Sequence, residues 1–224
     1  MRKSYLTLLA ASALLFTACG ESEEKTDDKE KKDNTEADAN EEPEVTTADF
    51  SVDSENSTLE WTGFKAEKPD YKHAGMVDVS SGNLSVEMKG DEMKVTGGTF
   101  TVDLTTIREP GAEDPKMEEK LVGHLSSPDF FNVSEYAKAT FTAESHDAES
   151  NVVSGKLSVL GQDIPATIEN PEMTMDGENL VIKADFSIDF SPLGMPGMQA
   201  KEGKEEEKIS ETIKFSADLV MNKM

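Results

Sequence analysis

The side chains that most often catalyse reactions or bind metals are few and scattered in this chain. Its three histidines, His73, His124 and His146, show no metal-ligand spacing. The sequence contains no GxSxG elbow, no HExxH motif and no glycine-rich phosphate loop after a strand. Carboxylates are too abundant to point to a site, with 46 Asp and Glu in 224 residues. We therefore expect a protein that is not an enzyme and that needs no cofactor or metal.

The chain's one cysteine, Cys19, predicts chemistry of another kind. The basic pair Arg2-Lys3 precedes the apolar run Leu6–Phe16, which is too short to span a bilayer and is typical of a signal peptide. Small residues, Thr17-Ala18, lie directly before Cys19. This arrangement resembles the lipobox of bacterial lipoproteins, whose cysteine receives lipid after the preceding peptide is removed. We predict a signal peptide over residues 1–18 and a lipidated Cys19; a secreted protein with an incidental cysteine is the alternative.

The segment after Cys19 is strongly acidic. From Glu21 to Thr47 it contains twelve acids, four lysines and only three apolar residues, too few for a core. Charge repulsion should keep residues 19–47 extended, as a disordered tether for a domain over residues 48–224. A calcium site is the weaker interpretation, because the glycine and terminal glutamate of a calcium loop are missing.

Charge and the anchor together predict the partners and the location. The formal net charge of -24 should repel phosphate backbones, so we expect no nucleic-acid binding. Gly20 rather than Asp follows the cysteine, which favours an outer-membrane lipoprotein of the cell envelope held by its acyl chains. Glu21–Glu24 also resembles an acidic signal that sends some Bacteroidetes lipoproteins to the outer face. Whether the domain faces the periplasm or the surface stays open, as does its oligomeric state.

Apolar and polar residues alternate through most of the remaining chain, which is typical of half-buried β-strands. Leu84–Met88 and Met93–Val95 flank a turn and predict a hairpin. At Gly97-Gly98 the alternation shifts by one residue, which indicates a β-bulge or a sharp bend. A second hairpin is predicted within Val153–Ile168, around a turn at Gly161–Asp163.

Two long strands and one helix complete the pattern. Leu180–Phe190 and Ile213–Met221 are long enough to cross a barrel wall obliquely. Asp114 is the expected N-cap of a short amphipathic helix that starts at Pro115, carries Met117, Leu121 and Leu125 on one face, and stops near Pro128. Strands without βαβ alternation predict an all-β fold, an extended antiparallel β-barrel with one short helix inserted.

One string of residues is specific enough to indicate a family. His124–Val133, followed by Tyr136–Phe141, resembles the hLkspdFFdvekyPtatF signature of the YceI-like family, the lipocalin-like polyisoprenoid-binding proteins of bacteria. The resemblance extends in order over Asp53–Gly63, Gly98–Asp103 and Ser154–Gly161, and so covers roughly residues 50–220. It departs where Ala137 replaces the usual proline.

The resemblance implies a lipocalin-like barrel of about eight strands with an elongated apolar cavity. That cavity would take the tail of an isoprenoid lipid, a polyisoprenoid or an isoprenoid quinone, for transport, storage or sequestration. His124 is the expected hydrogen-bond partner of a ligand head group, and the other histidines are expected as surface or helix residues. The predicted pocket residues are Trp61, Phe100, Leu121, His124, Leu125, Phe130, Phe131, Phe141, Phe186 and Phe215.

The sequence leaves three alternatives open. The barrel either holds a ligand or is filled by its own side chains, and in the second case the protein would be a structural module on an acidic stalk. Phe130 and Phe131 either plug one end of the barrel or line its cavity. Met195–Met198 is either a lip that adapts to a ligand or a disordered loop, and the loop is the preferred interpretation.

Overall fold

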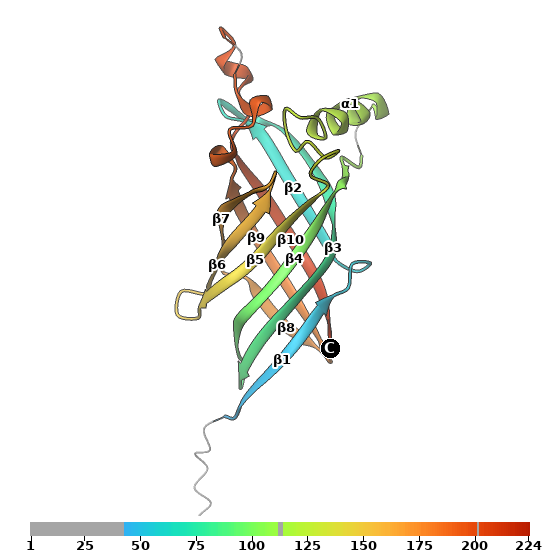
Figure 1. The fold of residues 1–224 in the computed structure, drawn as a ribbon. Helices are drawn as coiled ribbons and strands as arrows, with labels where there is room; N and C mark the ends of the chain where they lie inside the picture. The colour runs from blue at the N-terminus through green and yellow to red at the C-terminus, as the bar shows by residue number, and fades with distance from the viewer. Residues whose placement is uncertain (1–42, 112–113, 201) are drawn as a thin grey trace, which may run out of the picture. The chain divides into compact units, whose positions relative to one another are not determined.

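The structure, a computed structural model, describes residues 43–111, 114–200 and 202–224 (Figure 1). The predicted signal peptide, the predicted lipidation site Cys19 and most of the predicted acidic tether lie outside these ranges. In the described ranges no helix has the length and apolar character needed to cross a membrane.

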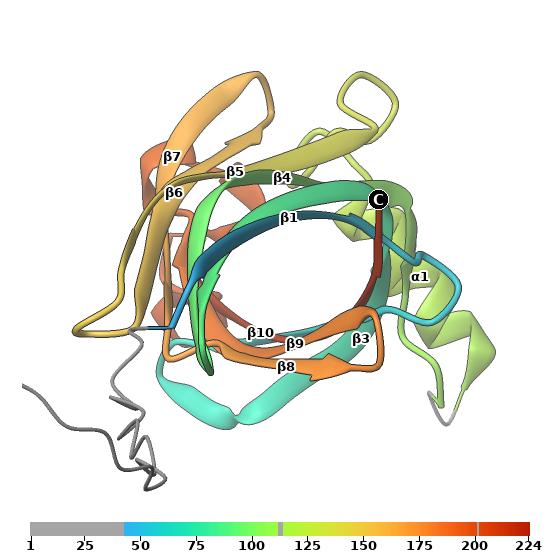
Figure 2. The same cartoon turned by 90° about the horizontal axis from the view of Figure 1, so that it is seen from below.

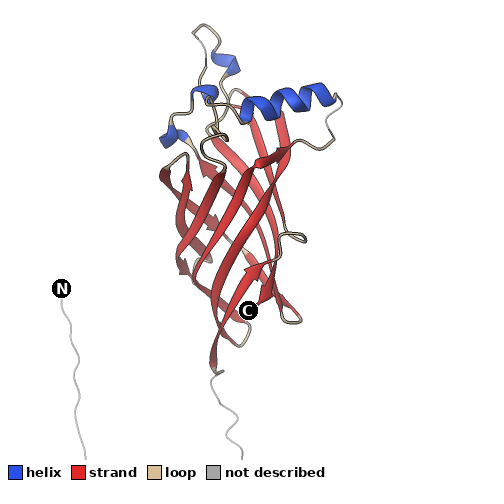
Figure 3. Cartoon of the chain, turned by 45° about the vertical axis from the view of Figure 1, so that its right-hand side comes forward, coloured by secondary structure: helices blue, strands red, loops and turns tan. Residues whose placement is uncertain are grey.

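The described residues form ten strands, one α-helix and three short 3-10 helices. The strands are β1 (Val45–Val52), β2 (Thr58–Lys65), β3 (Lys68–Lys89), β4 (Glu92–Arg108), β5 (Lys138–Asp147), β6 (Val152–Val159), β7 (Gln162–Glu169), β8 (Glu172–Asp176), β9 (Asn179–Asp189) and β10 (Thr212–Lys223). The helices are α1 (Pro115–Leu125), η1 (Ser191–Leu193), η2 (Pro196–Met198) and η3 (Glu205–Glu207). All four helices gather at one end of the sheet (Figure 3).

The ten strands belong to one antiparallel sheet that curls into a barrel (Figure 2). Their order is β7-β6-β5-β4-β3-β1-β10-β9-β8, and β2 also pairs with β10 and β3. β1 and β2 share one side of the wall, because both pair with β3 and β10, so the ten strands take nine places in the sheet. The predicted antiparallel barrel of about eight strands is therefore confirmed. Its closure is uneven, because β7 lies beside β9 with no backbone pairing between these two described strands.

The hairpins predicted from alternation are present. β3 and β4 meet at a turn that contains Gly90, whose φ is 62°. The predicted bulge is also confirmed: Ser85 faces Gly97 and Val86 faces Val95, so Thr96 is an extra residue in β4. The β6–β7 turn places Leu160 and Gly161 at φ values of 52° and 71°, as in a type I′ turn.

Side-chain contacts on the outer wall support the β6–β7 hairpin. The Ser158 hydroxyl donates to the Asp163 carboxylate, and the Lys156 ammonium lies 2.9 Å from its other oxygen. The Ser158 hydrogen bond, followed by that of Lys156, lowers the pKa of Asp163. The carboxylate therefore stays charged and links the two strands at neutral pH.

The end of the barrel opposite α1 is filled by its own side chains. Phe50, Val86, Leu180 and Met221 are the largest fully buried side chains there. Strand register contributes to this packing, because Leu180 is paired with Met221, and Phe50 is paired with Leu84, two residues before Val86 on the same face of β3. Hydrophobic burial closes this end, and we call it the closed end.

The helix forms where the sequence predicts it. The side chain of Asp114 accepts a hydrogen bond from the Lys116 amide at 3.0 Å, and Pro115 is the first helical residue. Met117 departs from the prediction, because its side chain is 57% exposed, and no residue of α1 is buried. The amphipathic face therefore covers less of the barrel than its four-residue spacing indicates.

The first strand begins earlier than the predicted boundary at Ala48. β1 starts at Val45, and Val45–Thr47 pair with Glu87–Lys89 of β3. These residues are exposed and contribute backbone pairing rather than core packing, so the apolar pattern contains no sign of them.

Candidate ligand-binding cavity

The barrel encloses an elongated cavity of about 720 Å³. This volume lies within the range of about 300 to 1,000 Å³ that is usual for small-molecule sites. Every strand except β1 contributes side chains to its wall, because each strand turns alternate residues inward. The wall is almost entirely aliphatic and aromatic, and the cavity stops above the packed closed end.

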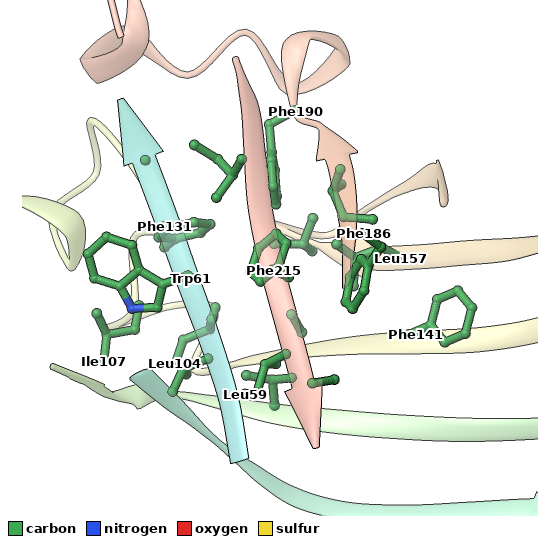
Figure 4. Close-up of a pocket in the computed structure, with 18 of the residues that line it drawn as sticks. Leu59, Trp61, Leu104, Ile107, Phe131, Phe141, Leu157, Phe186, Phe190 and Phe215 are labelled. Atoms are coloured by element: carbon green, nitrogen blue, oxygen red, sulfur yellow. The ribbon is translucent and has the colours of Figure 1, made fainter. Parts of the chain in front are cut away.

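Four phenylalanines form a continuous row along one side of the cavity (Figure 4). Phe186 and Phe215 face each other on β9 and β10, and their rings stack with centroids 5.4 Å apart. Phe190 lies 6.4 Å from Phe215 and meets Phe131 edge-on at 6.0 Å. The row is therefore built by strand register on β9 and β10 and is extended by the segment after α1.

Trp61 forms another part of the wall and depends on a glycine. Its indole nitrogen donates to the Met76 carbonyl at 3.3 Å. A Cβ atom at Gly75 would lie 2.6 Å from the indole ring and 2.1 Å from the Arg108 carbonyl oxygen. Only glycine at this position lets the Trp61 indole and the Arg108 carbonyl both approach the backbone of β3 so closely.

Helix α1 and the segments around η1 and η2 cover the open end of the cavity (Figure 1). Phe130 is 3% exposed and meets the His124 ring edge-on at 4.8 Å. The Gly197 amide donates to the Asp129 carbonyl at 2.8 Å, which brings the glycine onto the Phe130 ring.

The predicted preference for a disordered loop at Met195–Met198 is not what the structure shows. Met195 and Met198 are both buried, and η2 lies within this segment. The segment packs on Phe130 because its two methionines and the bare backbone of Gly197 fit around an aromatic ring.

Polar lining residues gather at this open end, which we call the mouth. Lys65, Tyr71 and His73 come from the β2–β3 hairpin, Lys120 and His124 from α1, and Glu207 from η3. His73 Nδ1 lies 2.8 Å from Glu109 Oε1. The Lys65 ammonium stands 4.6 Å from the centre of the Tyr71 ring. A ligand that fills the cavity would therefore have its apolar part inside and its polar part at the mouth.

His146 is buried, contrary to the expectation of a surface or helix position. Its Nδ1 accepts a hydrogen bond from the Val95 amide at 3.0 Å, so the hydrogen is on Nε2, which lies 3.2 Å from Asn151 Oδ1. Asn151 in turn donates to the Pro171 carbonyl at 3.3 Å. His146 therefore links the β3–β4 hairpin to the β5–β6 hairpin, Asn151 continues the link to the β7–β8 connection, and His146 lies outside the cavity lining.

The structure brings all the predicted pocket residues together on the cavity wall: Trp61, Phe100, Leu121, His124, Leu125, Phe130, Phe131, Phe141, Phe186 and Phe215. Their contact with a ligand stays a prediction. Among the polar residues of the mouth, His124 was predicted from the sequence, whereas Lys65, Tyr71, His73, Lys120 and Glu207 were not. Extending the alternation back from Val79 and Val77 through Gly75 would have placed His73 and Tyr71 on the inner face of β3.

Comparisons with known proteins agree with this geometry. Residues 50–221 match the family model described as a YceI-like domain. No curated protein matches the chain. BcnA of Burkholderia cenocepacia superposes with a TM-score of 0.55 at 17% identity, over 75% of this chain and 98% of that one. A polyisoprenoid binding domain from Saccharophagus degradans, implicated in plant cell wall breakdown, gives 0.51 at 15% identity, over 78% and 98%. At these identities the two structures show a shared fold.

Proposed function

Since the chain belongs to the YceI-like family, we propose that its barrel binds an isoprenoid lipid, a polyisoprenoid or an isoprenoid quinone, for transport, storage or sequestration. The observation that carries this proposal is the cavity, which is long, apolar and bordered by polar groups only at its mouth. The Saccharophagus degradans domain of the same fold is described as polyisoprenoid-binding, which supports the choice of ligand.

The energetics favour a chain of several isoprene units. Burying one methylene contributes about 0.8 kcal/mol, so a five-carbon unit contributes about 4 kcal/mol. Association costs about 4 to 15 kcal/mol in lost translational and rotational freedom. One unit at most offsets the lower part of this cost, whereas several units give a net affinity without any charged contact. An apolar tail therefore suits this wall better than a short polar metabolite.

A binding role without catalysis is supported by the residue types in the cavity. The part of its lining that belongs to described residues contains no Ser, Thr, Cys or Asp. His73 and Glu109 form a pair of the kind that orients a general base, but such a pair needs a nucleophile or a water site beside it. We therefore assign the cavity to storage or transfer of an intact lipid. The alternative of a filled barrel on an acidic stalk is less consistent with a volume of about 720 Å³.

We further propose that Cys19 is acylated and anchors the protein in the outer membrane. The apolar run that ends in small residues before Cys19 supports this assignment. Replacing Cys19 with Ser should move the protein from the membrane pellet to the soluble fraction. A variant that stays in the pellet with its signal peptide removed would show that the anchor is elsewhere.

Trp61 provides a direct test of lipid binding. It is the chain's one tryptophan and lies on the cavity wall, so a bound tail should change its fluorescence. We expect the protein as purified to retain host lipid, detected by native mass spectrometry and organic extraction. After delipidation, prenyl alcohols of increasing length should bind more tightly with each unit until the cavity is full.

A cavity-filling variant provides the control. Ala184 and Ala217 face each other on β9 and β10, and both line the cavity. Replacing Ala217 with Phe should shorten the longest tail that still gains affinity, while circular dichroism checks that the barrel remains folded. Absence of host lipid, together with an unchanged Trp61 signal for every alcohol, would overturn the proposal.

A further inference from the structure

His146 is the one polar or charged residue that is buried in the described part of the chain, at 8% exposed. It lies on β5 where that strand separates from β4, because the backbone pairing of the two strands ends at Gly98 and Ala143. Three residues further along both strands, the His146 ring bridges them, and its Nδ1 accepts the hydrogen bond of the Val95 amide at 3.0 Å. The ring therefore takes the place of a strand partner at this position.

The residues that this ring connects belong to the wall of the cavity. Val95 is buried and lines the cavity, as does Val153, the residue of β6 that is paired with His146. Asn151 contacts the second ring nitrogen and donates to the carbonyl of Pro171, which is also a lining residue. A change at the ring nitrogens of His146 therefore changes the support of the wall on three sides.

Protonation would break this link, because it removes the acceptor. A neutral histidine accepts at one ring nitrogen, whereas a protonated histidine donates at both. A hydrogen on Nδ1 would face the Val95 N–H, so that two donors would meet and the buried amide would lose its acceptor.

From this geometry we infer that His146 is a pH sensor behind the cavity wall. Its protonation separates β4 from β5 at Val95 and lowers the affinity of the barrel for its lipid, an effect that rests on the proposed function. The stability of the fold should be lost as the pH falls, because the unfolded chain takes up a proton that the folded link excludes.

The charged residues around the ring leave the sign of this effect unchanged. Their side chains are exposed: Lys94 on β4, Glu144 and Asp147 on β5, Glu149 in the β5–β6 turn, and Glu169 and Glu172 on either side of the β7–β8 connection. Lys156 of β6 is paired with Asp163 at 2.9 Å. Hydrogen bonds from Ser150, and to a smaller degree the charge of His146, lower the pKa of Asp147, so this carboxylate stays ionised where histidine titrates. An exposed carboxylate compensates little for a buried amide without an acceptor.

The test compares the stability of the full-length protein at about pH 7.5 and about pH 5.5, on either side of the ordinary midpoint of histidine titration. Denaturant unfolding is followed by circular dichroism. His146→Asn keeps a side-chain oxygen that can accept from the Val95 amide and that does not titrate. As the pH falls, the unfolding equilibrium constant of the unmodified protein should rise up to about tenfold more than that of His146→Asn, the limit for one proton taken up about one pH unit below 6.5.

His124→Asn is the matched control, because it makes the same change at an exposed histidine. It should retain the dependence of stability on pH. Protonation of His73 would strengthen its ion pair with Glu109, 2.8 Å away, and would act in the opposite direction. Comparison of each variant with the unmodified protein therefore isolates the contribution of His146.

Geranylgeraniol tests the effect on binding, since this probe carries no charge at either pH. Trp61 lies on the cavity wall, and its fluorescence reports binding to the delipidated full-length protein. Between the two pH values the affinity of the unmodified protein should fall by about 2- to 10-fold, as the loss of one hydrogen bond provides, and that of His146→Asn should fall less.

The outcomes separate this inference from the proposed function. Parallel changes of stability in the unmodified protein and in His146→Asn would overturn the pH sensor. A constant affinity for geranylgeraniol, while stability falls, would overturn its effect on the lipid. Failure of the probe to bind at either pH would contradict the proposed function, whereas the stability comparison judges His146 without any ligand.

Nuclear magnetic resonance of the unmodified protein gives the answer if His146→Asn does not fold. At about pH 7.5 the ring should be neutral with its hydrogen on Nε2, and at about pH 5.5 the Val95 amide should lose protection from hydrogen exchange, after correction for the intrinsic rate. A ring that gains a proton while the Val95 amide keeps its protection would overturn the inference.

Discussion

Trp61 and Gly75 illustrate how one missing side chain shapes the cavity wall. The indole ring lies where a Cβ atom of Gly75 would be, and the Arg108 carbonyl approaches from the other side. Changing Gly75 to Ala should therefore lower the free energy of unfolding by about 1 to 3 kcal/mol, as overpacking does, and should shift the Trp61 emission. Denaturant unfolding followed by circular dichroism measures the first effect, and fluorescence measures the second.

Gly97 provides the matched control for this substitution. It lies on β4 of the same sheet, and no atom lies within 4 Å of a Cβ atom built there. Gly97→Ala should leave both the stability and the emission close to those of the unmodified protein. Equal effects of the two substitutions would show that backbone freedom, rather than the contact with Trp61, is what Gly75 provides.

Phe130 and Phe131 are neighbours in sequence with different surroundings. Phe130 is buried beneath the Gly197 backbone, whereas Phe131 is half-buried and meets Phe190 edge-on in the cavity. Phe130→Ala should cost about 3 to 5 kcal/mol of stability, as expected for a buried phenylalanine. Phe131→Ala should cost less and should mainly weaken retention of lipid. Thermal unfolding and mass spectrometry of extracted lipid separate the two effects, and a reversed pattern would contradict this assignment.

At the level of elements, α1 is held at the mouth by partly exposed side chains. None of its residues is buried, and Gly123 is exposed within it, with no atom near the place of a Cβ. Gly123→Ala should stabilise the helix by about 0.5 to 1 kcal/mol, because alanine loses less backbone entropy than glycine.

Amide hydrogen exchange measures this effect locally. Protection should increase over Pro115–Leu125 and stay unchanged in the strands, since the helix can open without the barrel. Increased protection throughout the barrel would contradict this, by showing that the helix and the sheet open as one unit.

Alternation made the long strands predictable, because each has one face on the core and one toward water. Leu180–Phe190 and Ile213–Met221 show this pattern without interruption, and both form strands with the expected inner face. The start of β1 was not predicted, because the side chains of Val45–Thr47 are exposed. The β2–β3 hairpin was not predicted either, because the first residues of β3, from Lys68 to Lys72, are mostly polar and exposed.

The cavity wall was predictable in the same way, but the empty volume inside it was not. Sequence shows which face of a strand turns inward, and Phe141 or Phe186 could equally fill a core. The volume depends on how far apart the strands stand, which a pattern along one chain does not contain. Pairings such as His73 with Glu109 escaped for a related reason, because they join residues that only the folded sheet brings together.

For the whole molecule, the boundary between tether and barrel gives a paired test. Deleting residues 22–42 should leave the thermal transition almost unchanged, because the acidic segment has hardly any apolar groups to contribute to a core. Deleting residues 22–47 should lower the transition, since it also removes Val45–Thr47, which pair with β3. Differential scanning calorimetry compares the two. A large fall with the shorter deletion would show that the acidic segment stabilises the barrel.

The described strands β7 and β9 lie side by side without backbone pairing, so hydrogen bonds do not hold the barrel wall together at this contact. Spreading the wall between any two hydrogen-bonded strands would break a row of backbone hydrogen bonds, whereas here it would separate only side chains. Both strands of this contact line the cavity, β7 with Ile168 and β9 with Phe186 among other residues. The width of the barrel can therefore adjust at this contact, and the proposed isoprenoid tail, with its bulky methyl branches, would need no change in the pairing of the other strands.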